Sequence, residues 1–256
     1  MAELAEAAPR AVDPRLTRLK RVAIVPAYNE EESVARVIDE ILAFDPDFEV
    51  VVVDDGSADR TTAAAAKRGA HVVRLPFNLG IGGAVQTGFR YAFEHGFQLA
   101  VRVDGDGQHD PAQLALLLGP VLADEADIAV GSRFATRGGF RSSRSRRLGI
   151  TILARTVSML VGRRVTDPTS GFQALNRRAI ALFAADYPHD YPEVEATLMV
   201  HRHELRLAEV PVEMRERAGG RSSIGSLAAA YYMVKVMLAL FVGLFRKNVT
   251  PLEEVK

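Results

Sequence analysis

Cysteine is absent from this chain of 256 residues, which excludes disulfide bonds and thiolate chemistry and is consistent with a reducing compartment. Charge of one sign is not in excess either, because 32 lysines and arginines balance 32 aspartates and glutamates. A nucleic-acid partner held by bulk electrostatics is therefore not expected. Met1–Arg10 contains no apolar run, so we do not expect a signal peptide there, and we expect residues 1–19 to form a frayed tail.

What the chain does contain is an alternation of apolar runs with helical patterns, such as Gly82–Glu94, through about residue 130. The runs Arg21–Val25, Phe48–Val53 and Gln98–Val103 have the composition of strands buried on both faces. This alternation is typical of a mostly parallel sheet with crossover helices. A chain of this length can bury one sizeable core, and no internal repeat is present, so we predict one α/β domain over residues 20–225.

Two carboxylates, Asp104 and Asp106, follow the third apolar run directly. Residues two apart in an extended segment point to the same side, and the glycines at 105 and 107 let a ligand approach the backbone closely. Hard cations such as Mg²⁺ are usually held by one or two carboxylates plus substrate phosphates. The pattern therefore indicates a metal–diphosphate site, and a solvated acidic turn is the alternative.

Acidic residues also follow the second apolar run, where Asp54 and Asp55 begin a turn. Ligands of open α/β sheets bind outside the carboxyl ends of the strands, so we expect one of these two carboxylates to meet a ligand. Asp59, later in the same turn, is expected to cap the helix that follows.

The first apolar run leads into Pro26, Ala27 and Tyr28, followed by Asn29 and Glu30. A helical pattern comes next, so Asn29 is a candidate N-cap, and acids suit the first turn of a helix. Helix capping explains the asparagine and the acids but does not explain the Pro-Ala-Tyr sequence. A rigid turn that carries an aromatic ring suits a nucleobase pocket.

The segment from Arg133 to Val165 contains no acidic residue but nine arginines. A solvated basic face, a phosphate site and a surface that meets an anionic membrane would each explain such a run. Guanidinium forks match phosphate geometry, and the segment begins in a glycine- and serine-rich loop soon after the acidic turn. We therefore favour a functional role for these arginines.

The segment Ser226–Phe245 is strongly apolar and has about the length that a bilayer span needs. Lys235 in its middle argues against a plain span. A core helix, an interfacial helix and a short span remain open, and we favour an interfacial helix over residues 226–247 with a tail over residues 248–256. Attachment is then expected to be peripheral, or to need a separate integral-membrane partner.

Six short motifs occur in a fixed order along residues 20–225, and together they are specific although each one alone is weak. The motifs are Pro26-Ala27-Tyr28-Asn29-Glu30, Asp54-Asp55-Gly56-Ser57, Asn78-Leu79-Gly80-Ile81-Gly82-Gly83-Ala84, Asp104-x-Asp106-x-Gln108, Gly131-Ser132-Arg133 and Asp167-Pro168-Thr169-Ser170-Gly171-Phe172. This order resembles family 2 glycosyltransferases of the GT-A fold, and within them the dolichyl- and polyprenyl-phosphate sugar synthases.

The resemblance implies a donor site, a metal site and an acceptor site. The nucleotide-sugar is expected to contact Pro26, Tyr28, Glu30, Asp54, Asp55, Asn78, Gly80 and Asp104. Mg²⁺ or Mn²⁺ is expected on Asp104, Asp106 and Gln108. The acceptor phosphate is expected on Arg133, Arg147, Thr151, Arg217 and Ser222. Arg144 and Arg146 compete with Arg147, and Ser223 stands where the family often has lysine, so Arg221 is a candidate for supplying that charge.

The function that the resemblance implies is an inverting, metal-dependent transfer of a sugar from GDP-mannose or a UDP-hexose to a polyprenyl phosphate at the cytoplasmic membrane face. Asp106, Arg133 and Asp167 are the candidate catalytic residues. An ionised phosphate needs no strong base. A hydroxyl acceptor would need one, and Asp167 is then the leading candidate, ahead of Glu193 and Glu195.

Two alternatives differ from this function. One is transfer to a hydroxyl of a glycan or small molecule, and the other is an inactive nucleotide-sugar-binding module. The paired Asp104 and Asp106 and the presence of Arg133 argue against the inactive module. The chain contains no tryptophan and therefore lacks the Q-x-x-R-W motif of the family's processive members.

Overall fold

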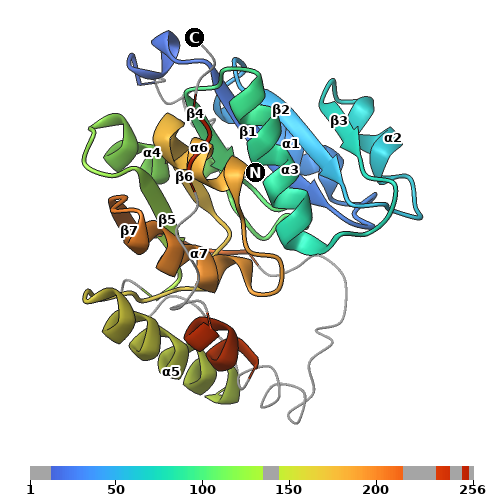
Figure 1. Ribbon diagram of the computed structural model, residues 1–256. Helices are drawn as coiled ribbons and strands as arrows, with labels where there is room; N and C mark the ends of the chain where they lie inside the picture. The colour runs from blue at the N-terminus through green and yellow to red at the C-terminus, as the bar shows by residue number, and fades with distance from the viewer. Residues whose placement is uncertain (1–12, 135–143, 216–234, 243–249, 254–256) are drawn as a thin grey trace, which may run out of the picture.

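The computed structural model describes residues 13–134, 144–215, 235–242 and 250–253, with only the backbone described for residues 144–148. A 7-stranded sheet runs through this part of the chain (Figure 1). Its strands are β1 (Arg21–Ala27), β2 (Glu49–Asp54), β3 (His71–Arg74), β4 (Leu99–Arg102), β5 (Ile128–Ser132), β6 (Gln173–Asn176) and β7 (Leu207–Pro211).

The strand order in the sheet is β3-β2-β1-β4-β6-β5-β7. β1 pairs in parallel with β2 and β4, β2 with β3, and β5 with β7. β6 runs antiparallel to both of its neighbours. The sheet is therefore mostly parallel, as the sequence predicted, and the turns that follow β1, β2 and β4 lie at one edge of it.

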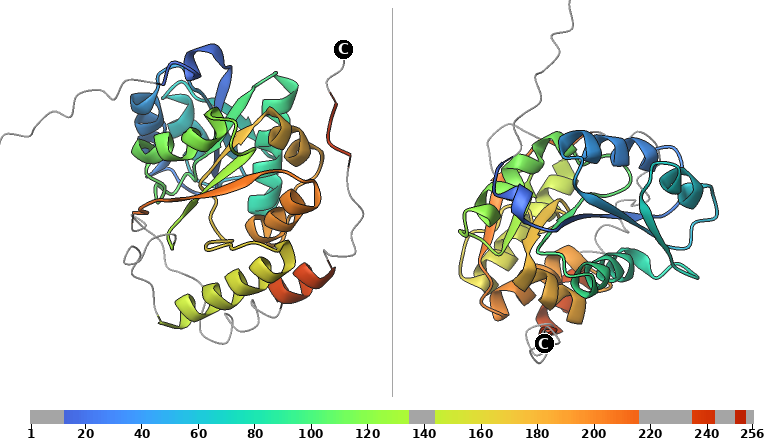
Figure 2. Two further views of the ribbon diagram at one scale, coloured as in Figure 1. Left: turned by 90° about the vertical axis from the view of Figure 1, so that its left-hand side faces the viewer. Right: turned by 90° about the horizontal axis from the view of Figure 1, so that it is seen from above.

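Helices cover both faces of the sheet (Figures 1 and 2). They are α1 (Val34–Phe44), α2 (Thr61–Ala66), α3 (Gly80–Glu94), α4 (Leu114–Leu122), α5 (Arg144–Val161), α6 (Arg177–Ala185) and α7 (Pro192–Arg202), with short 3₁₀ turns η1 (Leu16–Arg18) and η2 (Pro111–Gln113). One face of the sheet packs on α1 and α4, and the other packs on α3, α6 and α7. Alternate residues of each buried strand supply the two faces.

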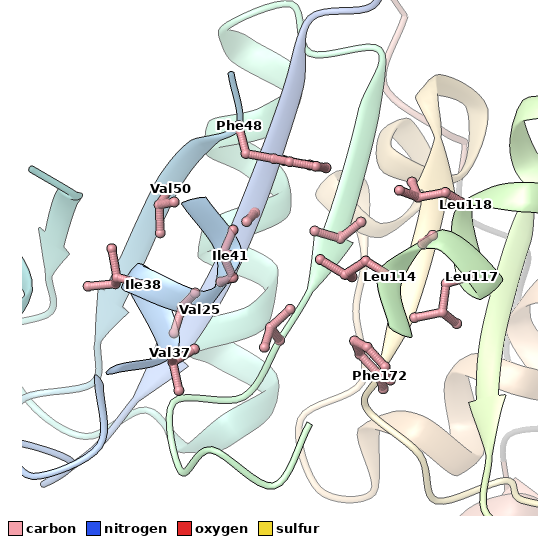
Figure 3. Packing of buried hydrophobic residues seen from close by; sticks show 14 of the residues in the cluster. Val25, Val37, Ile38, Ile41, Phe48, Val50, Leu114, Leu117, Leu118 and Phe172 are labelled. Atoms are coloured by element: carbon pink, nitrogen blue, oxygen red, sulfur yellow. The ribbon is translucent and has the colours of Figure 1, made fainter. Parts of the chain in front are cut away.

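The core beneath α1 and α4 follows from the helical spacing of their apolar residues (Figure 3). Val37, Ile38 and Ile41 of α1 lie over the sheet together with leucines of α4, and all are buried. Leu16 of η1 belongs to the same cluster and is 2% exposed. Residues 13–19, assigned to the tail from the sequence, thus contain an element that packs on the sheet.

A separate apolar cluster joins α5, α7 and a helical segment at residues 235–242 (Figure 2). Val236 and Leu240 of that segment are buried in the cluster, whereas Leu238, Phe241 and Val242 are exposed. The remainder of the predicted interfacial helix lies outside the described residues. No helix among the described residues combines the length and the hydropathy that a membrane crossing requires.

Candidate active site

Backbone hydrogen bonds join the turns that follow β1, β2 and β4. The amide of Asp55 donates to the Ala27 carbonyl at 2.9 Å, and the amide of Gly105 donates to the Pro26 carbonyl at 3.1 Å. A Cβ on residue 105 would lie 3.1 Å from the Pro26 oxygen, so glycine permits this close approach. Pro26, the penultimate residue of β1, therefore contacts the turn at residues 104–107, which we name the D-x-D turn.

Asn29, one candidate for the N-cap of α1, does not cap this helix. The N-cap position is Ser33, and Asn29 has a φ of 54° in the turn before it. The amide of Asn29 donates to Ser57 Oγ at 2.9 Å, and Asn29 Oδ1 accepts from the amide of Ala58 at 2.9 Å. Asn29 thus fastens the turn after β1 to the turn after β2, a partnership between residues far apart in the sequence.

In the structure, Asp59 has nearly the helix-capping role that was expected from the sequence. Its Oδ1 accepts from the amide of Thr61, the first residue of α2, at 2.9 Å, although the N-cap position itself is Arg60. Its Oδ2 accepts from the amide of Glu31 at 3.1 Å, and the amide of Glu30 donates to Thr61 Oγ1 at 2.8 Å. These bonds hold the turns after β1 and β2 in a fixed arrangement relative to each other.

The neighbouring carboxylates Asp54 and Asp55 have different environments. Asp54 is fully buried, and its oxygens accept from the amide of Ser57 at 2.8 Å and from the Thr62 hydroxyl. Asp55 accepts from the amide of Leu79 at 2.7 Å. Burial raises the pKa of Asp55, while the amides of Leu79 and Gly80 act to lower it. Asp54 therefore stabilises its own turn, and Asp55 binds the turn that opens α3.

The turn that opens α3 exposes apolar side chains beside Asp55. Phe77 and Leu79 are 63% and 44% exposed, and Tyr28, in the turn after β1, is 48% exposed. Asn78 Oδ1 accepts from the amide of Gly80, which has a φ of 82° and begins α3 two residues earlier than predicted. Asn78 and Gly80 thus shape this turn, and the aromatic ring of Tyr28 is accessible to a ligand.

The D-x-D turn is half-buried and internally hydrogen-bonded. Asp106 Oδ1 accepts from the amide of Gln108 at 3.0 Å, and Gly107 has a φ of 73°. The carbonyl of Gln108 accepts from the amide of Arg215 at 2.9 Å. Arg215, the last residue described before the gap at 216–234, thus pairs with the residue that directly follows this turn.

A buried arginine lies behind the D-x-D turn, and the sequence analysis did not single it out. Arg102 is 1% exposed, and its Nε donates to Asp104 Oδ1 at 3.1 Å. Its Nη2 lies 2.9 Å from Glu193 Oε1, and its Nη1 donates to the Tyr187 hydroxyl at 3.3 Å. Burial acts to lower the pKa of Arg102, but Asp104 and Glu193 raise it above its ordinary value. The sequence signal that could have identified Arg102 is a charged residue inside an otherwise apolar strand.

Arg102 also explains the glycine of the Asp167–Phe172 motif. A Cβ on Gly171 would lie 2.6 Å from Arg102 Nη2 and 2.8 Å from its Cζ. The guanidinium therefore packs directly against the backbone of residue 171. Arg102 contacts the D-x-D turn, this motif and the N-terminal turn of α7, where Glu193 lies.

His109 connects the D-x-D turn to the Asp167–Phe172 motif. Its Nδ1 accepts from the amide of Asp104 at 3.0 Å, and its ring stacks on Phe172 with centroids 4.8 Å apart. Burial lowers the pKa of His109 to about 4; Arg102 and Arg133 add to this effect, and Asp104 opposes it. The imidazole is therefore neutral near neutral pH, with its proton on Nε2.

Arg133 and Asp167 form a bidentate ion pair. Arg133 Nε and Nη2 donate to the two Asp167 oxygens at 2.7 and 2.8 Å, and Nη2 also donates to Thr169 Oγ1 at 2.7 Å. Asp167 is fully buried, and its own amide donates to Glu209 of β7 at 2.9 Å. Arg133 and Asp167, which were predicted separately, thus lie together, and the carboxylate holds the guanidinium in one orientation.

Several predicted acceptor residues cannot be located at the site. Thr151 is an exposed residue of α5. Arg147 lies in the first turns of the same helix, but its side chain is outside the described part, as are Arg217 and Ser222 altogether.

The residues that could hold a metal ion suit a cation that a bound ligand also coordinates. Among the described residues, no three carboxylate or imidazole groups gather as a complete cage. Asp104 and Asp106 are half-buried at a strand end, and Mg²⁺ characteristically binds one or two carboxylates plus substrate phosphates. The residues present are therefore compatible with a divalent cation that arrives together with a diphosphate.

Residues 22–183 match the family described as Glycosyl transferase family 2. The chain belongs to this family. It is 32% identical over 236 residues to the polyprenol monophosphomannose synthase of Mycolicibacterium smegmatis, covering 88% of this glycosyltransferase and 89% of that protein. It is 33% identical over 215 residues to the undecaprenyl-phosphate mannosyltransferase of Micrococcus luteus, covering 80% and 88%.

The fold of this family 2 glycosyltransferase is the GT-A fold. It resembles the crystal structure of glucosyl-3-phosphoglycerate synthase from Mycobacterium tuberculosis in complex with Mn²⁺, uridine diphosphate and glucosyl-3-phosphoglycerate. The TM-score is 0.70 at 22% identity, over 90% of this chain and 81% of that one. The predicted fold class, family and enzyme class are thus confirmed.

Proposed function

We propose that this glycosyltransferase moves a sugar from GDP-mannose or a UDP-hexose to a polyprenyl phosphate, with inversion at the anomeric carbon. The Arg133–Asp167 ion pair, connected to the D-x-D turn through His109, is the observation that carries the proposal. It supplies a fixed guanidinium for an anionic acceptor. The names of the two mannosyltransferase relatives support the same acceptor class.

The donor would lie across the ends of β1, β2 and β4. Tyr28 offers an exposed ring for the nucleobase, and Asp55 is the better of the two turn carboxylates for a polar contact to it, because both Asp54 oxygens are engaged in the turn. Glu30, Asn78 and Gly80 shape the walls. Asp104 would meet the ribose or the cation.

Asp104, Asp106 and Gln108 would hold Mg²⁺ or Mn²⁺ against the diphosphate. Such a cation, when bound, neutralises negative charge that develops on the departing nucleoside diphosphate. Arg102 contributes from behind, because its hydrogen bond to Asp104 holds that carboxylate in one orientation. The position of Asp104 therefore does not depend on the cation alone.

Arg133 would bind the acceptor phosphate, together with Arg147, Thr151, Arg217 and Ser222. A phosphate monoester has its second pKa near 6, so its oxygen is already a nucleophile near neutral pH and needs no strong base. That oxygen forms the bond to the anomeric carbon as the bond to the diphosphate oxygen breaks on the opposite face. Asp167 then orients Arg133, and the rate gain comes from proximity and charge alignment.

We also propose that the protein attaches peripherally to the cytoplasmic face of the membrane. Leu238, Phe241 and Val242 are 61%, 59% and 54% exposed on the helical segment at residues 235–242. Apolar side chains gathered on one side of a helix suit the membrane interface. The remaining residues of 226–247 are proposed to continue this surface, with or without an integral-membrane partner.

The test compares two acceptors that differ only in the phosphate. Purified enzyme is incubated with Mg²⁺ or Mn²⁺, a panel of labelled nucleotide-sugars, and either a short polyprenyl phosphate or the matching polyprenol. We expect label in the organic phase only with the phosphate, and its loss on addition of a chelator. Asp106→Asn should lower kcat by about 10²-fold or more. Asp39→Asn, at an exposed carboxylate of α1, is the matched control.

Transfer to the alcohol but not the phosphate would overturn the acceptor assignment and make Asp167→Asn the next variant. Donor binding without transfer to either compound, in the presence of metal and detergent, would favour the inactive module.

A further inference from the structure

The D-x-D turn is also contacted from the side of α1, away from Arg102. A Cβ on Gly107 would lie 2.3 Å from Arg36 Nη2, so the Arg36 guanidinium packs directly against the backbone of this turn. Arg36 belongs to α1, and its Nη1 donates to Oε1 of Glu40, one helical turn later, at 3.2 Å. The glycine at 107 thus permits a direct contact between α1 and the D-x-D turn.

Glu40 connects Arg36 to a second arginine, Arg215, which follows β7. Arg215 Nη1 donates to Glu40 Oε2 at 2.7 Å, and its Nη2 donates to Asp110 Oδ1 at 2.8 Å. Isolated surface ion pairs contribute little, but these four side chains form one network. The network joins α1, the residues after β4 and the residues after β7.

Backbone groups bring the same two segments together. The amide of Arg215 donates to the carbonyl of Gln108, the residue after the D-x-D turn, at 2.9 Å. The Gln113 side chain donates to the Glu213 carbonyl at 2.6 Å and accepts from the Glu213 amide at 2.8 Å. The residues that follow β4 and β7 therefore lie side by side, although 100 positions separate Gln113 from Glu213.

These contacts fix the backbone of Gln108 and leave its side chain available. Its amide donates to Asp106 Oδ1 at 3.0 Å, and its carbonyl accepts from Arg215, so both backbone groups are engaged. Within the part of the chain that the structure describes, the half-buried Gln108 side chain has no hydrogen-bond partner. Its amide oxygen can therefore coordinate a cation without first breaking another contact.

We propose that Arg215, held by Glu40, is a positioning residue for Gln108 and so for the cation that Gln108 would help to hold. The proposal rests on the proposed function for the cation and adds residues that set its affinity. Arg215 holds the segment at two points, the Gln108 carbonyl and Asp110. Replacing residues that orient metal ligands typically changes metal affinity by about 10- to 100-fold. Loss of Arg215 should therefore weaken cation binding and leave metal-free nucleotide binding unchanged.

Nucleotide binding with and without Mn²⁺ tests the proposal without turnover. GDP and UDP are each titrated calorimetrically into the protein, and the ratio of the two Kd values measures the affinity gained from Mn²⁺. We expect Arg215→Met to raise the Kd with Mn²⁺ about tenfold and to leave the metal-free Kd unchanged, and Arg215→Lys to have a smaller effect. Arg68→Met is the matched control, because Arg68 is a half-exposed arginine that pairs with Asp39 of α1 at 3.4 Å.

Two outcomes of this titration would contradict different statements. If Arg215→Met keeps the full gain from Mn²⁺, Arg215 has no positioning role and the proposed function is unaffected. If the wild-type protein gains no affinity from Mn²⁺ with either nucleotide, the metal assignment in the proposed function is itself wrong.

A double-mutant cycle separates positioning from simple stabilisation. Glu40→Gln removes the charge that holds Arg215, so we expect a smaller loss of the same gain. Arg215→Met/Glu40→Gln should then bind no more weakly than Arg215→Met alone. Additive losses would show that Glu40 does not act through Arg215. Urea unfolding is measured on each variant, and a lower free energy of unfolding with an unchanged Kd would show a structural role only.

Discussion

At the scale of single residues, the site depends on polar groups that are buried and fully engaged. Arg102 satisfies Asp104, Glu193 and Tyr187 at once, and Gly171 leaves the space that its guanidinium occupies. An uncompensated buried charge is costly, so removal of one member affects all the others. Arg102 is therefore a positioning residue for the D-x-D turn.

Replacement of Arg102 is expected to damage both stability and activity. Arg102→Met should lower the free energy of unfolding by roughly 3–5 kcal/mol, because two carboxylates lose their buried cation. Arg178→Met, at a residue whose side chain is 60% exposed and 3.8 Å from Asp127, should change it by less than about 0.5 kcal/mol. Urea unfolding measures both.

Arg102→Lys separates the two effects. It keeps a positive charge but loses the forked geometry, so we expect partial recovery of stability and a larger loss in kcat than in donor KM. A variant with unchanged kcat would show that Arg102 has no positioning role.

The lowered pKa of His109 makes folding stability depend on pH. Burial lowers the pKa of His109 from 6.5 to about 4, so between these values the unfolded chain binds a proton that the folded protein does not. Stability is therefore lost as the pH falls from about 6.5 towards 4, by roughly 3 kcal/mol for this group. In metal-free protein, His109→Gln should flatten the dependence over this window, and His189→Gln, at an exposed histidine, should not.

At the scale of secondary-structure elements, the Arg133–Asp167 pair is held by β7. Glu209 accepts from the amides of Thr166 and Asp167 at 2.8 and 2.9 Å, which fixes the turn that carries the Arg133 partner. β7 lies beside β5, and Arg133 directly follows β5. The orientation of Arg133 thus depends on a strand pairing between residues that are far apart in the sequence.

Weakening the hydrogen bonds that Glu209 accepts should impair acceptor binding more than donor binding. Glu209→Gln replaces a charged acceptor by a neutral amide, and hydrogen bonds to charged groups contribute about 1.5–3 kcal/mol each. We expect a several-fold rise in the acceptor KM with an unchanged donor KM, measured by steady-state kinetics. Glu213→Gln, at an exposed carboxylate shortly after β7, is the control. An equal rise in both KM values would indicate general unfolding of the site instead.

At the scale of the whole molecule, the sheet and the α5 cluster have separate tasks. The strand ends carry the polar groups, whereas α5, α7 and residues 235–242 form their own apolar cluster at one side of the sheet (Figure 2). Exposed Leu238 and Phe241 on this side are suited to contact lipid.

Membrane association should therefore depend on this side of the molecule. The double variant Leu238→Asp/Phe241→Asp should reduce co-sedimentation with anionic phospholipid vesicles by at least about tenfold, since each large apolar side chain contributes roughly 1.5–3 kcal/mol when buried. Leu116→Asp, at a residue of α4 that is 48% exposed, should bind vesicles like the wild type. If both variants bind equally, the proposed membrane surface is wrong.

The sequence by itself indicated the strands that became β1, β2 and β4, their alternation with helices and the acidic turns, because apolar periodicity and turn composition are local properties. Through the order of the motifs it also indicated Arg133 and Asp167 as candidate site residues, and the fold pairs their side chains. Only the tertiary structure decided that β6 runs antiparallel to β4, and that Gly171 lies against Arg102 and Phe172 against His109.

The roles of individual polar groups were likewise decided by tertiary contacts. Asn29 joins two turns instead of capping α1, Asp54 is engaged within its own turn, and Arg102 is buried among three partners. A hydrogen bond or an ion pair depends on which distant residue arrives next to a side chain. Local pattern carries no information about that partner, so these assignments required the folded chain.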